Sequence, residues 1–274
     1  MKPTDICDRV MLDGRFVARD EARISPLGEG FMAGHGLFET IKVRRGRPVF
    51  LEEHVARLER GAKELELSVS GELRARCQLA IDANGLEAGV LKLVVFQNDS
   101  WTGELILART FVYPEAQGGS GWSLKLFSDE RVGGRNAELK TLNYLKNSRA
   151  RAAAKAAGFD EALFVSQTGV VLEGATTNVF LVKDGVVYTP ALNAGILPGI
   201  ARAVVLRELG EKGAREIAVT EVMLDRAEEI FVTNSLVGVM PVAKLEGRGY
   251  ELRSDGVTQR IRAAFREAEE RSIQ

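Results

Sequence analysis

Residues 114–121 interrupt the chain with proline, glycine and serine and contain no large apolar side chain. A stretch of this composition cannot contribute to a hydrophobic core, and it is typical of a linker. The chain has 274 residues, which is enough for two modest domains. We therefore predict a first domain at residues 1–114, a linker at 115–121 and a second domain at 122–274.

The first of these domains combines short strands with two helices. Asp13 and Gly14 lie between two apolar runs, a pattern typical of a two-residue hairpin turn. From residue 51 the apolar residues recur at helical spacing, with charged residues between them. We predict helices from residue 51 and at 71–84, and strands at residues 10–12, 15–18, 37–43, 89–96 and 105–112.

The second domain mixes the two kinds of element more evenly, and Asp184 and Gly185 mark another hairpin. These patterns predict a two-domain α+β protein. We predict helices at residues 143–157, 200–210 and 255–271, and strands at residues 122–127, 161–165, 178–182 and 229–233.

Composition excludes several classes of function. The 37 basic and 38 acidic residues give a net charge of −1, so the chain lacks the basic surface of a general nucleic-acid binder. Two cysteines and two histidines cannot make a disulfide framework or a typical zinc site, so no metal is expected. Neither a signal peptide nor an apolar run long enough to span a membrane is evident. We expect a soluble cytoplasmic protein.

Four stretches carry residues suited to chemistry. Lys140 lies between Leu139 and Leu142, where partial desolvation would make its amine nucleophilic. Glu173 is a carboxylate among small and hydroxyl residues between two apolar runs. Residues 195–202 include a Pro-Gly pair before an apolar run, which predicts a helix start suited to a phosphate. Residues 233–242 end a strand in a polar turn. Each stretch also has an ordinary structural interpretation when it is taken singly. Lys140 fits a surface lysine, Glu173 and residues 233–242 fit turns, and residues 195–202 fit a helix start that binds nothing.

Together, the four stretches resemble those of the class IV, branched-chain-type family of pyridoxal-phosphate enzymes. The resemblance also includes residues 34–40 (GHGLFET) and 53–58 (EHVARL), and it covers most of the chain. The family includes branched-chain and D-amino acid aminotransferases and 4-amino-4-deoxychorismate lyase. Membership implies fold type IV, with the active site between the two domains, pyridoxal 5′-phosphate as cofactor, a small amino substrate and a homodimer.

The resemblance implies roles for individual residues. Lys140, in the K-x-L-N stretch, would form the Schiff base with the cofactor. Glu173 would pair with the pyridinium nitrogen and keep the ring protonated. The phosphate would be bound by the Arg57 guanidinium, whose forked donors suit phosphoryl oxygens. The remaining phosphate contacts would come from the backbone N–H groups of Ile200 and Ala201 and from the Ser235 hydroxyl.

The chain departs from the family pattern at several of these positions. Ala201 stands where many relatives have threonine, so one hydroxyl contact to the phosphate is missing. Tyr144 matches a tyrosine that bonds the ring oxygen in some members, but its spacing from Lys140 differs by one. The arginine pairs that bind substrate in the D-amino acid and branched-chain aminotransferases are absent. Lys92 fills the branched-chain arginine position and is a candidate partner for a substrate carboxylate, although an edge strand would also accommodate it.

Residues 234–242 favour the lyase, because they follow the N-S-x-x-G-x-x-P-V form common in aminodeoxychorismate lyases. The alternative is an aminotransferase that acts on D-amino or branched-chain amino acids with a 2-keto acid acceptor. Both reactions use Lys140, Arg57 and Glu173, so these residues do not decide between them. A third possibility, a non-enzymatic binding module, would predict loss of these same side chains, and all three are present.

Overall fold

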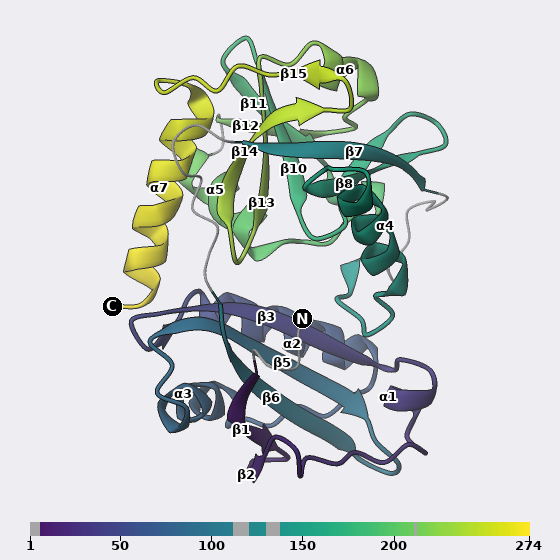
Figure 1. Cartoon of the computed structure of the whole chain (residues 1–274), viewed down its shortest axis with the longest axis vertical. Coiled ribbons are helices and arrows are strands. Elements are labelled where there is room, and N and C mark those ends of the chain that lie inside the picture. The colour runs from purple at the N-terminus through teal and green to yellow at the C-terminus, as the bar shows by residue number, and fades with distance from the viewer. Residues whose placement is uncertain (1–5, 112–120, 130–137, 211–212) are drawn as a thin grey trace. The chain divides into compact units, whose positions relative to one another are not determined.

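The computed structural model describes residues 6–111, 121–129, 138–210 and 213–274. They form two compact units, each of which contains helices and strands (Figure 1). The first unit comprises the described residues of Met1–Tyr113 together with Leu139–Asn143 and Glu269–Gln274. The second comprises the described residues of Pro114–Glu138 and Tyr144–Ala268. The predicted α+β class is confirmed.

The first unit is built on a six-stranded antiparallel sheet with the strand order β2-β1-β6-β5-β3-β4. Helices α2 and α3 pack on one face of it, and their apolar side chains join those of the sheet in a buried core. The strands are β1 (Ile6–Leu12), β2 (Arg15–Ala18), β3 (Gly36–Arg44), β4 (Arg47–Pro48), β5 (Ala88–Gln97) and β6 (Thr102–Thr110). The helices are α1 (Glu29–Met32), α2 (Leu51–Glu64) and α3 (Leu73–Ala83).

The local patterns predicted most of these elements. Asp13 and Gly14 have φ values of 52° and 75°, the left-handed conformation that the two-residue turn between β1 and β2 requires. The helix predicted from residue 51 begins at Leu51. The strand predicted at 105–112 is displaced, since β6 begins at Thr102 and ends at Thr110. Pairing with β5 determines these bounds, because Thr102 faces Gln97 and Thr110 faces Gly89.

Strand β3 has two chemically different faces. Leu37, Ile41 and Val43 belong to the core under α2 and α3, and Glu39 lies on the same side by strand alternation. Phe38 lies on the opposite side. Glu39 is thus a carboxylate on the buried, helix-covered face, where charged groups require partners.

The second unit contains a nine-stranded mixed sheet with the order β12-β11-β10-β13-β14-β7-β8-β9, and β15 pairs with β14. The pairs β11–β12, β14–β7 and β7–β8 are parallel. Its strands are β7 (Trp122–Asp129), β8 (Glu161–Ser166), β9 (Val171–Gly174), β10 (Asn178–Lys183), β11 (Val186–Pro190), β12 (Ala214–Ile217), β13 (Glu229–Asn234), β14 (Gly238–Leu245) and β15 (Arg248–Gly249). Its helices are α4 (Leu145–Ala156), the 3-10 helix η3 (Leu192–Ala194), α5 (Ile200–Leu209), α6 (Glu221–Asp225) and most of α7 (Val257–Ser272). Among the described residues, no helix is both long and apolar enough to cross a bilayer.

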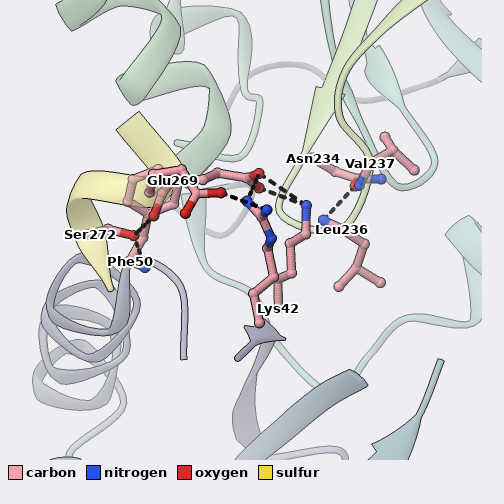
Figure 2. Close-up of polar contacts among 9 residues, drawn as sticks. Lys42, Phe50, Asn234, Leu236, Val237, Glu269 and Ser272 are labelled. Atoms are coloured by element: carbon pink, nitrogen blue, oxygen red, sulfur yellow. Dashed lines mark hydrogen bonds and ion pairs between the residues drawn. The ribbon is translucent and has the colours of Figure 1, made fainter. Parts of the chain in front are cut away.

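The predicted domains were continuous in sequence, at residues 1–114 and 122–274, with Lys140 in the second. In the structure, Leu139–Asn143 instead belong to the first unit, because this segment pairs with the start of β3. The last turn of α7 also belongs to the first unit, where Glu269 accepts hydrogen bonds from Lys42 Nζ at 2.8 and 3.1 Å (Figure 2). The predicted linker at 115–121 lies outside the described residues, except for Gly121.

Candidate active site

Lys140 is held against the beginning of β3 by backbone hydrogen bonds on both sides. The Phe38 N–H donates to the Lys140 carbonyl oxygen at 2.9 Å, and the Leu142 N–H donates to the Gly36 carbonyl oxygen at 3.0 Å. A short antiparallel bridge joins Leu37 to Thr141 between them. The predicted lysine is therefore fixed by pairing with a strand about 100 residues earlier in the chain.

The Lys140 side chain shares an aromatic ring with a second lysine. The Nζ atom of Lys140 lies 4.6 Å from the centre of the Phe38 ring, and the Nζ atom of Lys92 lies 4.4 Å from it. Cations at this distance are attracted to the π-electrons of the ring. Burial of Lys92, and then the charge of Arg109, lower the pKa of the Lys92 amine. The structure thus brings together two residues that were predicted separately.

Arg57 belongs to a buried cluster with Glu39 and His54. Its Nε and Nη2 atoms donate to the two Glu39 oxygens at 2.8 and 2.6 Å. The His54 Nδ1 atom lies 2.7 Å from Glu39 Oε2. Burial alone would raise the pKa of Glu39, but the charge of Arg57 and the hydrogen bonds from His54 and Arg57 outweigh it and lower that pKa to about 2. The carboxylate is therefore ionised at neutral pH.

Sequence reasoning identified Arg57 and missed the other two members of this cluster. Two signals were present. Glu39 is a carboxylate between Leu37 and Ile41 on the apolar side of its strand, and His54 precedes Arg57 by three residues, about one turn of helix α2. Their meeting depends on how α2 packs on β3, which neither local pattern specifies.

In the second unit, Glu173 supports the loop that leads into α5. Its Oε2 atom accepts a hydrogen bond from the Leu197 N–H at 3.0 Å and contacts Asn178 Nδ2 at 3.5 Å. Asn178 Nδ2 also donates to the Leu197 carbonyl oxygen at 3.0 Å. A Cβ atom at Gly199 would lie 2.0 Å from Asn178 Oδ1, so only glycine allows this approach. The glutamate predicted from the sequence is therefore next to the predicted helix start.

Helix α5 begins at Ile200, with Gly199 as its N-cap, as the Pro-Gly pair predicted. The N–H groups of Ile200 and Ala201 belong to the first turn, where backbone donors have no carbonyl partner within the helix. Ser235 follows β13, and Asn178 at the start of β10 pairs with Thr233 near the end of β13. The Ser235 hydroxyl therefore belongs to the same end of this strand pair as Asn178.

The turn that carries Ser235 is shaped by the preceding residue. Asn234 Oδ1 accepts hydrogen bonds from the N–H groups of Leu236 and Val237, both at 2.9 Å (Figure 2). An asparagine that bonds the backbone two and three residues ahead stabilises a tight turn. Asn234, the first residue of the N-S pair that favoured the lyase in the sequence, thus has a structural role in shaping this turn.

Tyr144 is half-buried immediately before helix α4. Its hydroxyl donates to the Ala175 carbonyl oxygen at 2.7 Å. This contact places it beside the segment that follows Glu173, within the second unit. Because the hydroxyl proton is used in this contact, the predicted hydrogen bond to the cofactor's ring oxygen stays a prediction.

The described residues suit the cofactor that the resemblance implies. Lys140 offers a primary amine, Glu173 a buried carboxylate, Arg57 a forked cation and α5 an N-terminus, which are the groups that an aldehyde, a pyridinium and a phosphate need. In addition, the hydroxyl oxygens of Thr177 and Thr233 are buried without a hydrogen-bond partner among the described residues. Buried polar atoms in native proteins nearly always have a partner, so these two fit a site that takes a polar ligand.

The predicted site residues divide between the two units. The first unit holds the three basic side chains, and the second holds the carboxylate, the tyrosine and the helix start. Those in the first are Arg57, Lys92 and Lys140, and those in the second are Tyr144, Glu173, Ile200, Ala201 and Ser235.

Comparison with known proteins identifies the family of this chain. The family described as class IV amino-transferases matches residues 36–245. A D-alanine aminotransferase of Bacillus licheniformis is 31% identical over 88% of this chain and 89% of its own length. An aminodeoxychorismate lyase of Bacillus subtilis is 27% identical over 94% of this chain and 93% of its own. The solved branched-chain amino acid aminotransferase of Escherichia coli superimposes with a TM-score of 0.88 at 25% identity, covering 98% of this chain and 96% of that one.

The family match covers most of the chain, and it includes Lys140, Glu173, the start of α5 and Ser235. The fold of the solved relative agrees with fold type IV over nearly the whole length. Enzymes of this family depend on pyridoxal 5′-phosphate, and they act as aminotransferases or lyases. The chain belongs to the class IV aminotransferase family of pyridoxal-phosphate-dependent enzymes.

Proposed function

We propose that this enzyme is a 4-amino-4-deoxychorismate lyase, which forms 4-aminobenzoate and pyruvate. The observation that carries the proposal is the placement of Lys92 and Lys140 over one ring, at 4.4 and 4.6 Å. A cation beside the reacting amine suits a substrate that carries carboxylates as well as an amino group. The turn at Asn234 and Ser235, in the N-S form common among lyases, supports the same assignment.

The residues that we propose for cofactor binding act on different parts of it. Arg57, the N–H groups of Ile200 and Ala201, and the Ser235 hydroxyl bind the phosphate. Glu173 holds a proton on the ring nitrogen. Tyr144 contacts the ring oxygen. When bound, the cofactor supplies an aldehyde that takes up amines and a ring that accepts an electron pair from the substrate.

We assign the proton transfers to the Lys140 Nζ atom. In the lyase reaction a ring C–H proton is lost, the C–O bond to the enolpyruvyl group breaks, and that group leaves with the proton as pyruvate. The carbon ring becomes aromatic, so no oxidant or water is consumed. Lys140 Nζ removes the proton and can return it, because a neutral amine is a base and its conjugate ammonium is an acid. Lys92 binds a substrate carboxylate and orients the ring.

The second candidate is an aminotransferase that acts on D-amino or branched-chain amino acids. The 31% identity to a D-alanine aminotransferase favours it. The same groups would serve this reaction, in which Lys140 moves a proton and Lys92 binds the α-carboxylate. The reactions differ in their co-substrate, since only the aminotransferase requires a 2-keto acid.

Substrate assays on the purified holoenzyme distinguish the two. We expect release of 4-aminobenzoate from 4-amino-4-deoxychorismate without a keto acid. Turnover of D- or L-amino acids only with a keto acid, and none of the chorismate derivative, would replace the lyase by the aminotransferase. Lys92→Met should raise KM for the preferred substrate about tenfold or more, as expected when a charged hydrogen bond is lost, and Lys92→Arg should retain most of the affinity.

We also propose that the enzyme is a cytoplasmic homodimer. Four large apolar side chains between residues 24 and 32 support an interface, because Leu27, Phe31 and Met32 are 80%, 63% and 72% exposed and Ile24 is 45% exposed. Clustered exposed apolar residues commonly mark contacts with another chain. Sedimentation at the mass of a monomer under assay conditions would contradict the dimer.

A further inference from the structure

The Glu39 carboxylate is bound by two residues of helix α2. It is 1% exposed and accepts two hydrogen bonds from Arg57, to Oε1 at 2.8 Å and to Oε2 at 2.6 Å. His54 provides a third contact, at 2.7 Å. An Arg–carboxylate pair with two parallel hydrogen bonds fixes the plane of the guanidinium as well as its position. The orientation of Arg57 is therefore set by a residue of β3.

His54 stabilises the Glu39 carboxylate from the other side. Its Nδ1 atom faces a carboxylate oxygen, which can only accept, so Nδ1 carries the proton. Burial is the main reason that the pKa of His54 is lowered, and the charges of Arg57 and Lys140 add to it against the pull of Glu39. A neutral His54 thus donates one hydrogen bond and adds no charge. The negative charge of Glu39 is therefore balanced by the positive charge of Arg57.

Stability alone does not explain such a pair. Buried ion pairs are often no more stabilising than apolar residues of similar volume, because removing two charges from water is costly. The pair does have another consequence. An arginine side chain loses rotamer freedom, and therefore conformational entropy, when it is immobilised. Because Glu39 already immobilises Arg57, a ligand that binds Arg57 does not have to offset the loss of side-chain entropy.

We propose that Glu39 is a positioning residue that orients the Arg57 guanidinium for the cofactor phosphate, with His54 holding Glu39 in place. This inference rests on the proposed role of Arg57 as a phosphate ligand. It assigns a function to two buried residues, Glu39 and His54, that act through Arg57. Its signature is a defect specific to the phosphate part of the cofactor, which a general weakening of the fold would not produce.

The test compares binding of pyridoxal 5′-phosphate and of pyridoxal, which lacks the phosphate, to the apoprotein. The readout is the ratio of the two dissociation constants. A variant that is partly unfolded binds both compounds less well and leaves the ratio unchanged. We expect Glu39→Gln to weaken pyridoxal phosphate binding about 10- to 100-fold, the range seen when residues that orient a ligating side chain are changed, and to leave pyridoxal binding unchanged.

Three further variants make the test decisive. Glu39→Asp retains the charge and should recover part of the lost phosphate affinity. Glu59→Gln is the matched control, because Glu59 is a half-exposed carboxylate of the same helix that pairs with Arg74 at 2.8 Å. It should leave the ratio unchanged. In an Arg57→Ala background, Glu39→Gln should have no additional effect on the ratio, because Glu39 acts through Arg57.

The outcomes separate this inference from the role of Arg57. If Arg57→Ala lowers the preference for the phosphorylated compound and Glu39→Gln does not, Glu39 has no positioning role. Additive effects of the two changes would also overturn the inference. If Arg57→Ala itself leaves the ratio unchanged, the proposed phosphate contact of Arg57 is wrong, and the inference falls with it.

Discussion

The backbone N–H of Phe38 donates to the Lys140 carbonyl oxygen at 2.9 Å, while the Lys140 ammonium group lies 4.6 Å from the centre of the Phe38 ring. One residue of β3 thus contacts both the backbone and the side-chain end of the proposed reacting lysine. Since Phe38 also pairs with Val94 of β5, this part of β3 is anchored in the sheet and provides a rigid support for that amine. Sites carried on strands are held more accurately than sites on free loops.

Lys140 should be the lysine that carries the cofactor. Borohydride reduction of the holoenzyme followed by peptide mapping should place the pyridoxyl group on Lys140. Lys140→Ala should lose both the adduct and turnover. A pyridoxyl group on Lys92, whose amine lies over the same ring, would instead exchange the roles of the two lysines.

Lys146→Ala and Lys155→Ala are matched controls for this experiment. Both residues lie on α4, where Lys146 pairs with Asp129 and Lys155 pairs with Asp160 at 3.1 Å. These contacts occupy the two ammonium groups within the second unit. Both variants should retain the adduct and the activity.

Glu173→Gln should reduce turnover far more than cofactor affinity. The amide oxygen can still accept the Leu197 N–H, so the loop before α5 keeps its support. A neutral amide cannot balance a protonated ring nitrogen, so we expect kcat to fall about 100-fold, as for loss of one electrostatic contact at a reacting centre. Steady-state kinetics and cofactor titration measure the two effects separately.

Glu228→Gln is the control for Glu173. Glu228 is an exposed carboxylate that accepts a backbone N–H, that of Asp184, at 3.1 Å. It should alter neither kcat nor cofactor binding. Near-normal turnover in Glu173→Gln would mean that Glu173 only supports the loop.

Glu269→Ala should destabilise the first unit. Glu269 is 4% exposed and bonds Lys42, which is 11% exposed, at 2.8 Å (Figure 2). Removing one partner leaves a largely buried ammonium group without its carboxylate, at a cost of about 3 kcal/mol in the free energy of unfolding. Urea unfolding of the variant and the wild type measures this difference.

The control is Glu270→Gln, because Glu270 is 34% exposed and pairs with Arg44 at 2.6 Å and with the exposed Arg45 at 2.9 Å. Exposed pairs contribute about 1 kcal/mol or less. Replacing both partners of the buried pair, Lys42→Met with Glu269→Leu, should recover much of the stability. If Glu269→Ala costs no more than Glu270→Gln, the buried pair makes no special contribution.

His35 should make stability depend on pH near neutrality. Its Nδ1 atom lies 3.0 Å from Glu29 Oε2 and its Nε2 atom 3.1 Å from the Leu65 carbonyl oxygen. Both partners only accept, so both hydrogen bonds form only when the imidazole is protonated. The hydrogen bond to Glu29 is the main cause that raises the pKa of His35 above 6.5, and Glu66 adds a smaller contribution.

A raised pKa in the folded state sets the sign of this effect. The stabilisation is complete below pH 6.5, and it is lost as the pH rises through the higher pKa of the folded protein. Wild type should therefore exceed His35→Gln by about 1 kcal/mol or less at pH 5.5, with the difference vanishing at alkaline pH. Urea unfolding at several pH values tests this, and a difference independent of pH would exclude the titration of His35 as its cause.

Elements that depend only on neighbouring residues could be predicted from the sequence. Asp13 and Gly14 specified a hairpin because an L-residue and glycine that both adopt positive φ close a two-residue turn. The Pro-Gly pair before residue 200 specified the start of α5 because helix starts have local signals. Lys140, Glu173 and Arg57 were identified from short motifs whose spacing is likewise local.

Tertiary structure decided where those residues are anchored. Lys140 was predicted in the second domain, but it pairs with β3 across about 100 residues of chain. Glu39 and His54 were not recognised, because their contacts with Arg57 exist only once α2 packs on the sheet. Hydrophobic periodicity fixes which face of an element is buried, but not which partner covers it. Which partner covers that face depends on the free energy of packing distant segments together. In this protein, the packing of α2 on β3 brings the buried Glu39 carboxylate into contact with Arg57, the residue that we propose binds the phosphate.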